Sequence, residues 1–166
     1  MEKQFTTPIT DYSGLKAGDL VLLSGTIYTA RDAAHKRMAE MLKRGEPMPF
    51  DFAGNAVFYA GPCPAKPGQV IGSVGPTTAG RMDSYAPMLI GAGLRFMIGK
   101  GRRSQEVHDA LRRHGGIYFI TIAGAAAYIA RCVKSARVIA FDDLGTEAIR
   151  RLEVVEMPLI VDSIIN

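Results

Sequence analysis

Short apolar runs of strand length alternate with amphipathic segments along this chain of 166 residues. Seven runs have the length and composition of short buried strands, at 20–24, 56–60, 69–74, 94–98, 117–122, 137–141 and 159–162. Between them, helical spacing or small-residue content predicts helices at 30–44, 79–92, 104–114, 123–133 and 143–149. Alternating strands and helices are typical of an α/β domain. We expect residues 1–10 to form an N-terminal arm and residues 11–166 a single domain.

Local signals place the ends of several helices. Thr29 and Asp32 have the spacing of a capping box, and Gly45 follows the first helix. Ser104 is expected to cap the helix that ends before Gly115 and Gly116. The proline at position 87 should kink the helix at 79–92 or delay its start.

Composition excludes two classes of function. No apolar run approaches the ~20 residues that a membrane-spanning helix requires, and the N-terminus lacks the apolar segment of a signal peptide, so we expect a cytoplasmic protein. The net charge is +4, but the basic residues form no single stripe. Tryptophan is absent and the other aromatic residues are scattered, which argues against nucleic-acid binding. A diffuse positive charge suits a small dicarboxylate substrate instead.

The most informative segment is GPTTAGRMD at residues 75–83, which we expect to join the strand at 69–74 to the following helix. Free backbone N–H groups and the helix dipole favour a bound anion at such a junction. Arg81 adds a planar fork of donors that matches a carboxylate or phosphate. The alternative is a capped helix start, with Thr78 as N-cap and Arg81 solvated.

Two further cations are candidates for the same kind of site. Arg31 lies in the first turn of a helix, where a positive side chain is unfavourable, so a bound anion would explain it. Alternatively, Arg31 pairs with Asp32 or Asp51. Lys100 follows a strand between two glycines, and ligands of α/β sheets gather beyond the carboxyl ends of strands. Its alternative is a solvated lysine in a tight turn.

The remaining polar residues of interest receive structural interpretations. His35 lies one helical turn beyond Arg31 and is expected to shape its surroundings rather than react. Asp83 could orient Arg81 by a hydrogen bond. Cys63 and Cys132 are far apart and match no metal-ligand spacing, so this chain cannot hold an iron–sulfur cluster by itself.

The 75–83 segment resembles the signature of the class I, iron–sulfur-dependent fumarate hydratase and tartrate dehydratase family, in its C-terminal domain or β subunit. Other segments resemble that family in the same order, namely SGTIYTARDAAH at 24–35, YAGP at 59–62, MIGKG at 97–101 and DLGTEA at 143–148. The resemblance spans about residues 10–163. It implies a swivelling β/β/α domain with three layers, an arrangement that periodicity alone does not reveal.

The resemblance also implies a function. The chain would be the β subunit of a hydro-lyase that interconverts fumarate and L-malate, with Arg31, Arg81 and Lys100 binding the carboxylates. Thr77 would be the catalytic base and Thr78 would help to bind substrate. A [4Fe-4S] cluster would be held by a separate α subunit, in a heterotetramer, and an aspartate of that subunit would assist the base.

Two alternatives remain open from the sequence. The substrate could be tartrate, which differs from malate by one hydroxyl group. The chain could also be a binding module that kept the fold and lost the chemistry, although three cations around one loop argue against that reading.

Overall fold

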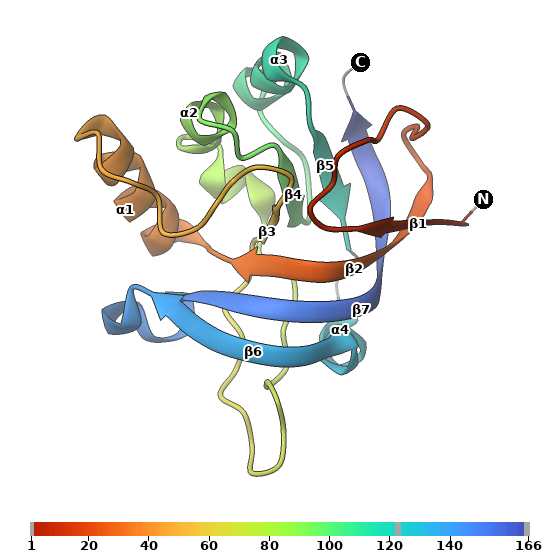
Figure 1. Cartoon of the computed structure of the whole chain (residues 1–166), viewed down its shortest axis with the longest axis vertical. Helices are drawn as coiled ribbons and strands as arrows, with labels where there is room; N and C mark the ends of the chain where they lie inside the picture. Colours follow the sequence, from red (N-terminus) through yellow and green to blue (C-terminus); the bar gives the residue numbers. More distant parts are fainter. Residues whose placement is uncertain (1, 122–123, 165–166) are drawn as a thin grey trace.

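The computed structural model describes residues 2–121 and 124–164 and shows a mixed α/β domain (Figure 1). The strands are β1 (Glu2–Thr6), β2 (Leu20–Thr29), β3 (Ala56–Phe58), β4 (Phe96–Gly99), β5 (Ile117–Ile120), β6 (Val133–Ala140) and β7 (Ile149–Ile164). The α-helices are α1 (Asp32–Lys43), α2 (Ala86–Gly91), α3 (Gln105–His114) and α4 (Ala126–Cys132). Two 3-10 helices, η1 (Ala79–Met82) and η2 (Asp142–Glu147), complete the set. Among the described residues, no helix combines the length and apolar character of a membrane span.

The sheet closes on itself as a small barrel. Its order is β1-β2-β3-β4-β5-β7-β6, and β2 also pairs with β7. Strands β2, β3, β4 and β5 are parallel neighbours, whereas β7 runs antiparallel to both β2 and β5. The long β7 therefore joins the two ends of the parallel part, and Figure 1 shows it curving alongside β2. Because the central strands are parallel, their carboxyl ends meet at one edge.

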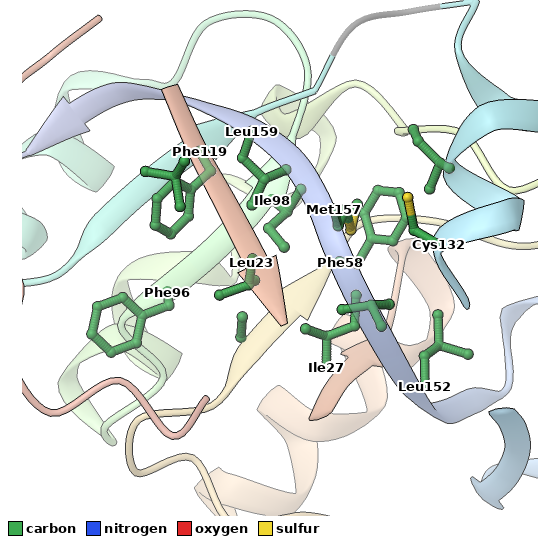
Figure 2. Close-up of a cluster of buried hydrophobic side chains, with 14 of the residues drawn as sticks. Leu23, Ile27, Phe58, Phe96, Ile98, Phe119, Cys132, Leu152, Met157 and Leu159 are labelled. Carbon is green, nitrogen blue, oxygen red and sulfur yellow. The ribbon is translucent and has the colours of Figure 1, made fainter. Parts of the chain in front are cut away.

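Two apolar cores lie on the two faces of the parallel strands. Phe58, Ile98 and Phe119 point into the barrel, where they meet Leu23 and Met157 (Figure 2). The alternate positions of the same strands point outward and pack against α1, α2 and α3. Both faces of these strands are thus buried, which explains why their sequences are continuous apolar runs.

Several helix predictions are confirmed. Helix α3 begins after Ser104, whose hydroxyl accepts a hydrogen bond from the Val107 N–H, and it ends at Gly115 with φ of 80°. Helix α1 matches the amphipathic segment at 30–44. The predicted helix at 79–92 is instead divided into η1 and α2, with the proline at position 87 in the first turn of α2. Positions 122 and 123, at the ends of two predicted elements, lie outside the described residues.

The predicted strand at 69–74 is wrong. Those residues belong to an irregular loop, in which the Cys63 N–H donates to the Ser73 carbonyl at 2.9 Å. The facing segment carries prolines at 62, 64 and 67, which have no N–H to donate to a ladder. Ile71 and Val74 are buried in the barrel core, so their apolar character reflects packing rather than strand pairing.

The N-terminal segment contributes to the sheet. Strand β1, within the stretch expected to form an arm, pairs in parallel with the first half of β2. The partner residues are those of the predicted strand at 20–24, from Leu20 opposite Glu2 to Ser24 opposite Thr6. The sequence of β1 gave no strong sign of this pairing, because polar residues such as Lys3 interrupt its apolar character.

Candidate active site

Three predicted site segments meet at the carboxyl edge of the parallel strands. Arg31 comes two residues after β2, and Lys100 comes directly after β4. The 75–83 loop lies beside them, because its Thr77 N–H donates to the Tyr59 carbonyl just beyond β3 at 2.6 Å. Thr78 forms an isolated parallel bridge with Lys100. The structure therefore gathers at one edge residues that are far apart in sequence, where α/β folds commonly bind ligands.

Backbone hydrogen bonds join the threonines to the turn at residues 99–101, here called the Lys100 turn. The Lys100 N–H donates to the Thr77 carbonyl at 3.4 Å, and the Ala79 N–H donates to the Lys100 carbonyl at 2.8 Å. Thr77 and Lys100 are half-buried and Thr78 is exposed. Gly99 permits the close approach, because a Cβ there would lie 2.8 Å from the Tyr59 ring.

The reactive side-chain groups of these residues are available. Within residues 2–121 and 124–164, the Thr77 and Thr78 hydroxyls and the Lys100 ammonium have no hydrogen-bond or ion-pair partner. A half-buried ammonium without a counter-ion favours an incoming anion, since the described residues supply no competing carboxylate.

Asp32 links the two predicted arginines. Its Oδ2 accepts from Arg81 Nε at 2.8 Å, and its Oδ1 accepts from Arg31 Nε at 3.5 Å. Arg31 thus pairs with Asp32, as one interpretation of the sequence held, whereas Asp51 accepts from the Ala53 N–H. Both arginines bind Asp32 through Nε. Their outer guanidinium nitrogens have no partner in the described part of the chain, so these nitrogens are free to bind a carboxylate.

The start of α1 depends on a residue distant in sequence. The predicted capping box is wrong. The N-cap of α1 is Arg31, whose side chain makes no capping hydrogen bond, and the Thr29 hydroxyl accepts from the Arg150 N–H instead. Glu147 supplies the missing acceptor, taking a hydrogen bond from the Ala33 N–H at 3.0 Å, and it lies 3.8 Å from Arg31 Nε. A contact across 114 positions is invisible to a local spacing rule.

His35 lies behind the site rather than in it. The residue is 1% exposed, its Nδ1 donates to the Arg31 carbonyl at 2.8 Å, and its ring packs edge-on against Tyr59. Burial lowers the pKa of His35 to about 4, and the charge of Arg103 acts in the same direction. His35 is therefore neutral at pH 7 and fixes the backbone from which Arg31 projects.

Asp83 does not orient Arg81, contrary to the prediction. Its Oδ1 accepts from Arg103 Nε at 2.8 Å and its Oδ2 accepts from the Ser104 N–H at 2.6 Å. Arg103 was missed as a site-related residue because its neighbours Arg102 and Lys100 made it resemble one more surface cation. Its side chain is 0% exposed.

The cysteines do not form a metal centre. Cys63 is exposed and Cys132 is buried, and neither is in a disulfide. Within the described residues, no group of three or more His, Cys, Asp or Glu side chains could hold a metal ion. These residues therefore do not fit an iron–sulfur cluster held by this chain alone.

Comparison with known proteins identifies the family. The family model described as "Fumarase C-terminus" matches residues 4–164. The chain belongs to this family. It is 42% identical to fumarate hydratase 2 of Leishmania major over 146 residues and 43% identical to the aerobic class I fumarate hydratase of Escherichia coli (strain K12) over 141 residues. These alignments cover 87% and 84% of the chain.

The family includes relatives of two sizes. The chain spans only 26% of each of those fumarate hydratases. The L(+)-tartrate dehydratase subunit beta of E. coli is 36% identical over 150 residues, which make up 87% of this chain and 73% of that subunit. The relatives are hydro-lyases, and this fumarase C-terminus chain matches most of a subunit of one type and about a quarter of the other.

Proposed function

We propose that this chain is the β subunit of a two-subunit, [4Fe-4S]-dependent hydro-lyase that interconverts fumarate plus water and L-malate. The identity of 43% to a class I fumarate hydratase supports the reaction. The match to a tartrate dehydratase subunit beta, a relative named as a subunit, supports a separate polypeptide as partner. One observation carries the proposal most directly. Asp32 joins arginines from two segments beside the Thr78–Lys100 bridge, which places three cations and two hydroxyls at one edge.

The proposal assigns the cluster to a separate α subunit, with two copies of each subunit in the assembly. This assignment is supported by the lack of any suitable ligand group among the described residues. The active site then lies at the subunit interface, and the isolated chain is inactive. In this proposal, the sheet and the helices α1, α2 and α3 on the outer face of its parallel strands belong to a three-layer swivelling β/β/α domain.

The cations bind the two carboxylates of the substrate. Arg31 and Arg81 each offer two outer guanidinium nitrogens, held in one region by Asp32. Lys100, which is bridged to Thr78 of the 75–83 loop, contributes a third charge, and the exposed Thr78 hydroxyl donates a further hydrogen bond. Charge-assisted hydrogen bonds of this kind orient a dicarboxylate as well as hold it.

Thr77 serves as the base in this proposal. In dehydration, the deprotonated Thr77 oxygen takes a proton from the carbon next to a substrate carboxylate, and the C–H electron pair becomes the double bond. The C–O bond to the neighbouring carbon breaks with its electron pair and releases hydroxide. One proton then returns to the hydroxide, so the water released contains the hydroxyl group and, in the overall balance, the proton taken from carbon. Lys100 stabilises the negative charge that develops on that carboxylate. A threonine hydroxyl is a weak base, so it needs the nearby cations and an aspartate supplied by the partner.

The test is anaerobic co-expression with the candidate cluster-bearing subunit, followed by the ultraviolet absorbance of fumarate formed from L-malate. Activity is expected only with both chains. Thr77→Ala should lower kcat at least about a hundredfold, the usual scale for loss of a general base. Thr77→Ser keeps the hydroxyl and should retain most of the activity. An unchanged rate in Thr77→Ala would remove Thr77 from this role.

Tartrate is the second candidate substrate, favoured by the L(+)-tartrate dehydratase subunit beta, which is 36% identical over 87% of this chain. The same preparation should be assayed with L(+)-tartrate. Turnover of tartrate without turnover of malate would establish a tartrate dehydratase, and the roles of Arg31, Arg81 and Lys100 would be unchanged. No turnover of either substrate would favour a binding module.

A further inference from the structure

A buried arginine lies directly beneath the candidate site. The Arg103 guanidinium donates from Nε to Asp83 Oδ1 at 2.8 Å and from one outer nitrogen to the Tyr59 hydroxyl at 3.1 Å. The other outer nitrogen faces Met97 Sδ at 3.7 Å. The guanidinium carbon lies 5.1 Å from the centre of the Tyr59 ring and 4.8 Å from that of Tyr118. The guanidinium therefore contacts four segments that are separate in the sequence.

Three of the partners of Arg103 hold segments of the site. Tyr59 accepts the Thr77 N–H with its backbone carbonyl. The Tyr118 hydroxyl donates to the Gly101 carbonyl at 2.8 Å and so holds the Lys100 turn. Asp83 is the last residue of the 75–83 loop. Its carboxylate also accepts a hydrogen bond from the N–H of Ser104, the residue after Arg103. The three segments converge on one guanidinium.

The burial of this network excludes a passive surface role. Tyr59 and Tyr118 are 1% and 0% exposed, and the Asp83 side chain is 12% exposed. A fully buried cation is costly unless it is paired and hydrogen-bonded, so the surrounding groups must keep their geometry to retain it. A lysine has one ammonium in place of a fork and could not serve Asp83 and Tyr59 from the same position.

We propose that Arg103 is a positioning residue that fixes the 75–83 loop and the Lys100 turn relative to each other. It thereby sets the distance between the Thr77 hydroxyl and the Lys100 ammonium. Arg103 does not touch the substrate; it acts through the two segments that do. The consequence for a dicarboxylate rests on the proposed function, whereas the coupling of the two segments does not.

Two variants test the coupling by amide hydrogen exchange of the purified chain. Arg103→Lys keeps the charge and removes the fork, and Tyr118→Phe keeps the ring and removes only the hydroxyl. In Arg103→Lys, the Ala79 and Lys100 amides, which bond across the two segments, should exchange at least about fivefold faster. The β2–β7 ladder should be unchanged. The exposed Tyr128→Phe is the matched control.

Kinetics of the assembled enzyme separate positioning from simple loss of folded protein. A smaller folded fraction lowers the apparent kcat and leaves KM unchanged. A displaced Lys100 should raise KM for the dicarboxylate at least about tenfold in Arg103→Lys, with a smaller rise in Tyr118→Phe. An unchanged KM together with unchanged exchange at the Ala79 and Lys100 amides would overturn the proposal. If the wild-type assembly has no hydro-lyase activity, the proposed function fails and the exchange rates alone decide the role of Arg103.

Discussion

The buried His35 gives the fold a pH dependence that can be calculated. An unfolded histidine has a pKa of about 6.5, whereas burial against Tyr59 lowers the pKa of His35 to about 4. The Arg31 carbonyl and the Asp32 carboxylate oppose this shift but do not reverse it. Between these two pKa values the unfolded chain binds a proton that the folded chain does not. Stability therefore falls as the pH is lowered from about 6.5 towards 4.

The size of the effect follows from the two pKa values. Between pH 7 and pH 5, titration of His35 should remove about 2 kcal/mol from the free energy of unfolding. The measurement is urea unfolding across this range, comparing the wild type with His35→Asn. Asparagine can still donate to the Arg31 carbonyl but does not titrate. The wild type should lose about 2 kcal/mol more than the variant, and equal losses in both would refute the reasoning.

Three further predictions concern the geometry of the site. Gly99→Ala should destabilise the fold by about 1–3 kcal/mol, because its new Cβ would lie 2.8 Å from a ring carbon. Gly14→Ala is the control, because a Cβ at that position meets nothing within 4 Å. Equal urea midpoints for Gly99→Ala and Gly14→Ala would contradict the prediction. Glu147→Ala removes the acceptor at the start of α1 and should cost about 0.5–2 kcal/mol in the same assay; no change would show that solvent replaces it. Asp32→Asn should change stability by less than about 1 kcal/mol, because its partner Arg81 is 54% exposed, and a loss above about 2 kcal/mol would contradict a surface pair.

The fold could be predicted from the sequence only to the level of a mixed α/β domain. Periodicity located β4, α1 and α3, where apolar spacing and the Ser104 cap act within a few residues. It could not locate the barrel closure, because the pairing of β2 with β7 joins segments more than a hundred residues apart. The same patterns made 69–74 look like a strand, since buried loop residues and strand residues share an apolar composition.

The candidate site was accessible from residue types and from the resemblance, but its supports were not. The sequence singled out Arg31, Arg81 and Lys100 as cations in positions that suit a bound anion. Their proximity depends on the carboxyl edge of the barrel, and the carboxylates beside them, Asp32 and Glu147, take part through tertiary contacts. The assignment of catalytic and binding roles stays a prediction.

The central claim is that the cations at this edge bind the carboxylates of a hydro-lyase substrate. The most direct measurement is kcat/KM for L-malate in the assembled enzyme, comparing Lys100→Met with Arg113→Met, which removes an exposed cation of α3. Loss of a charged hydrogen-bond donor to a carboxylate should cost about 1.5–3 kcal/mol, or about 10- to 150-fold in kcat/KM, for Lys100→Met. Arg113→Met should match the wild type. Equal kcat/KM values for Lys100→Met and Arg113→Met would contradict the account.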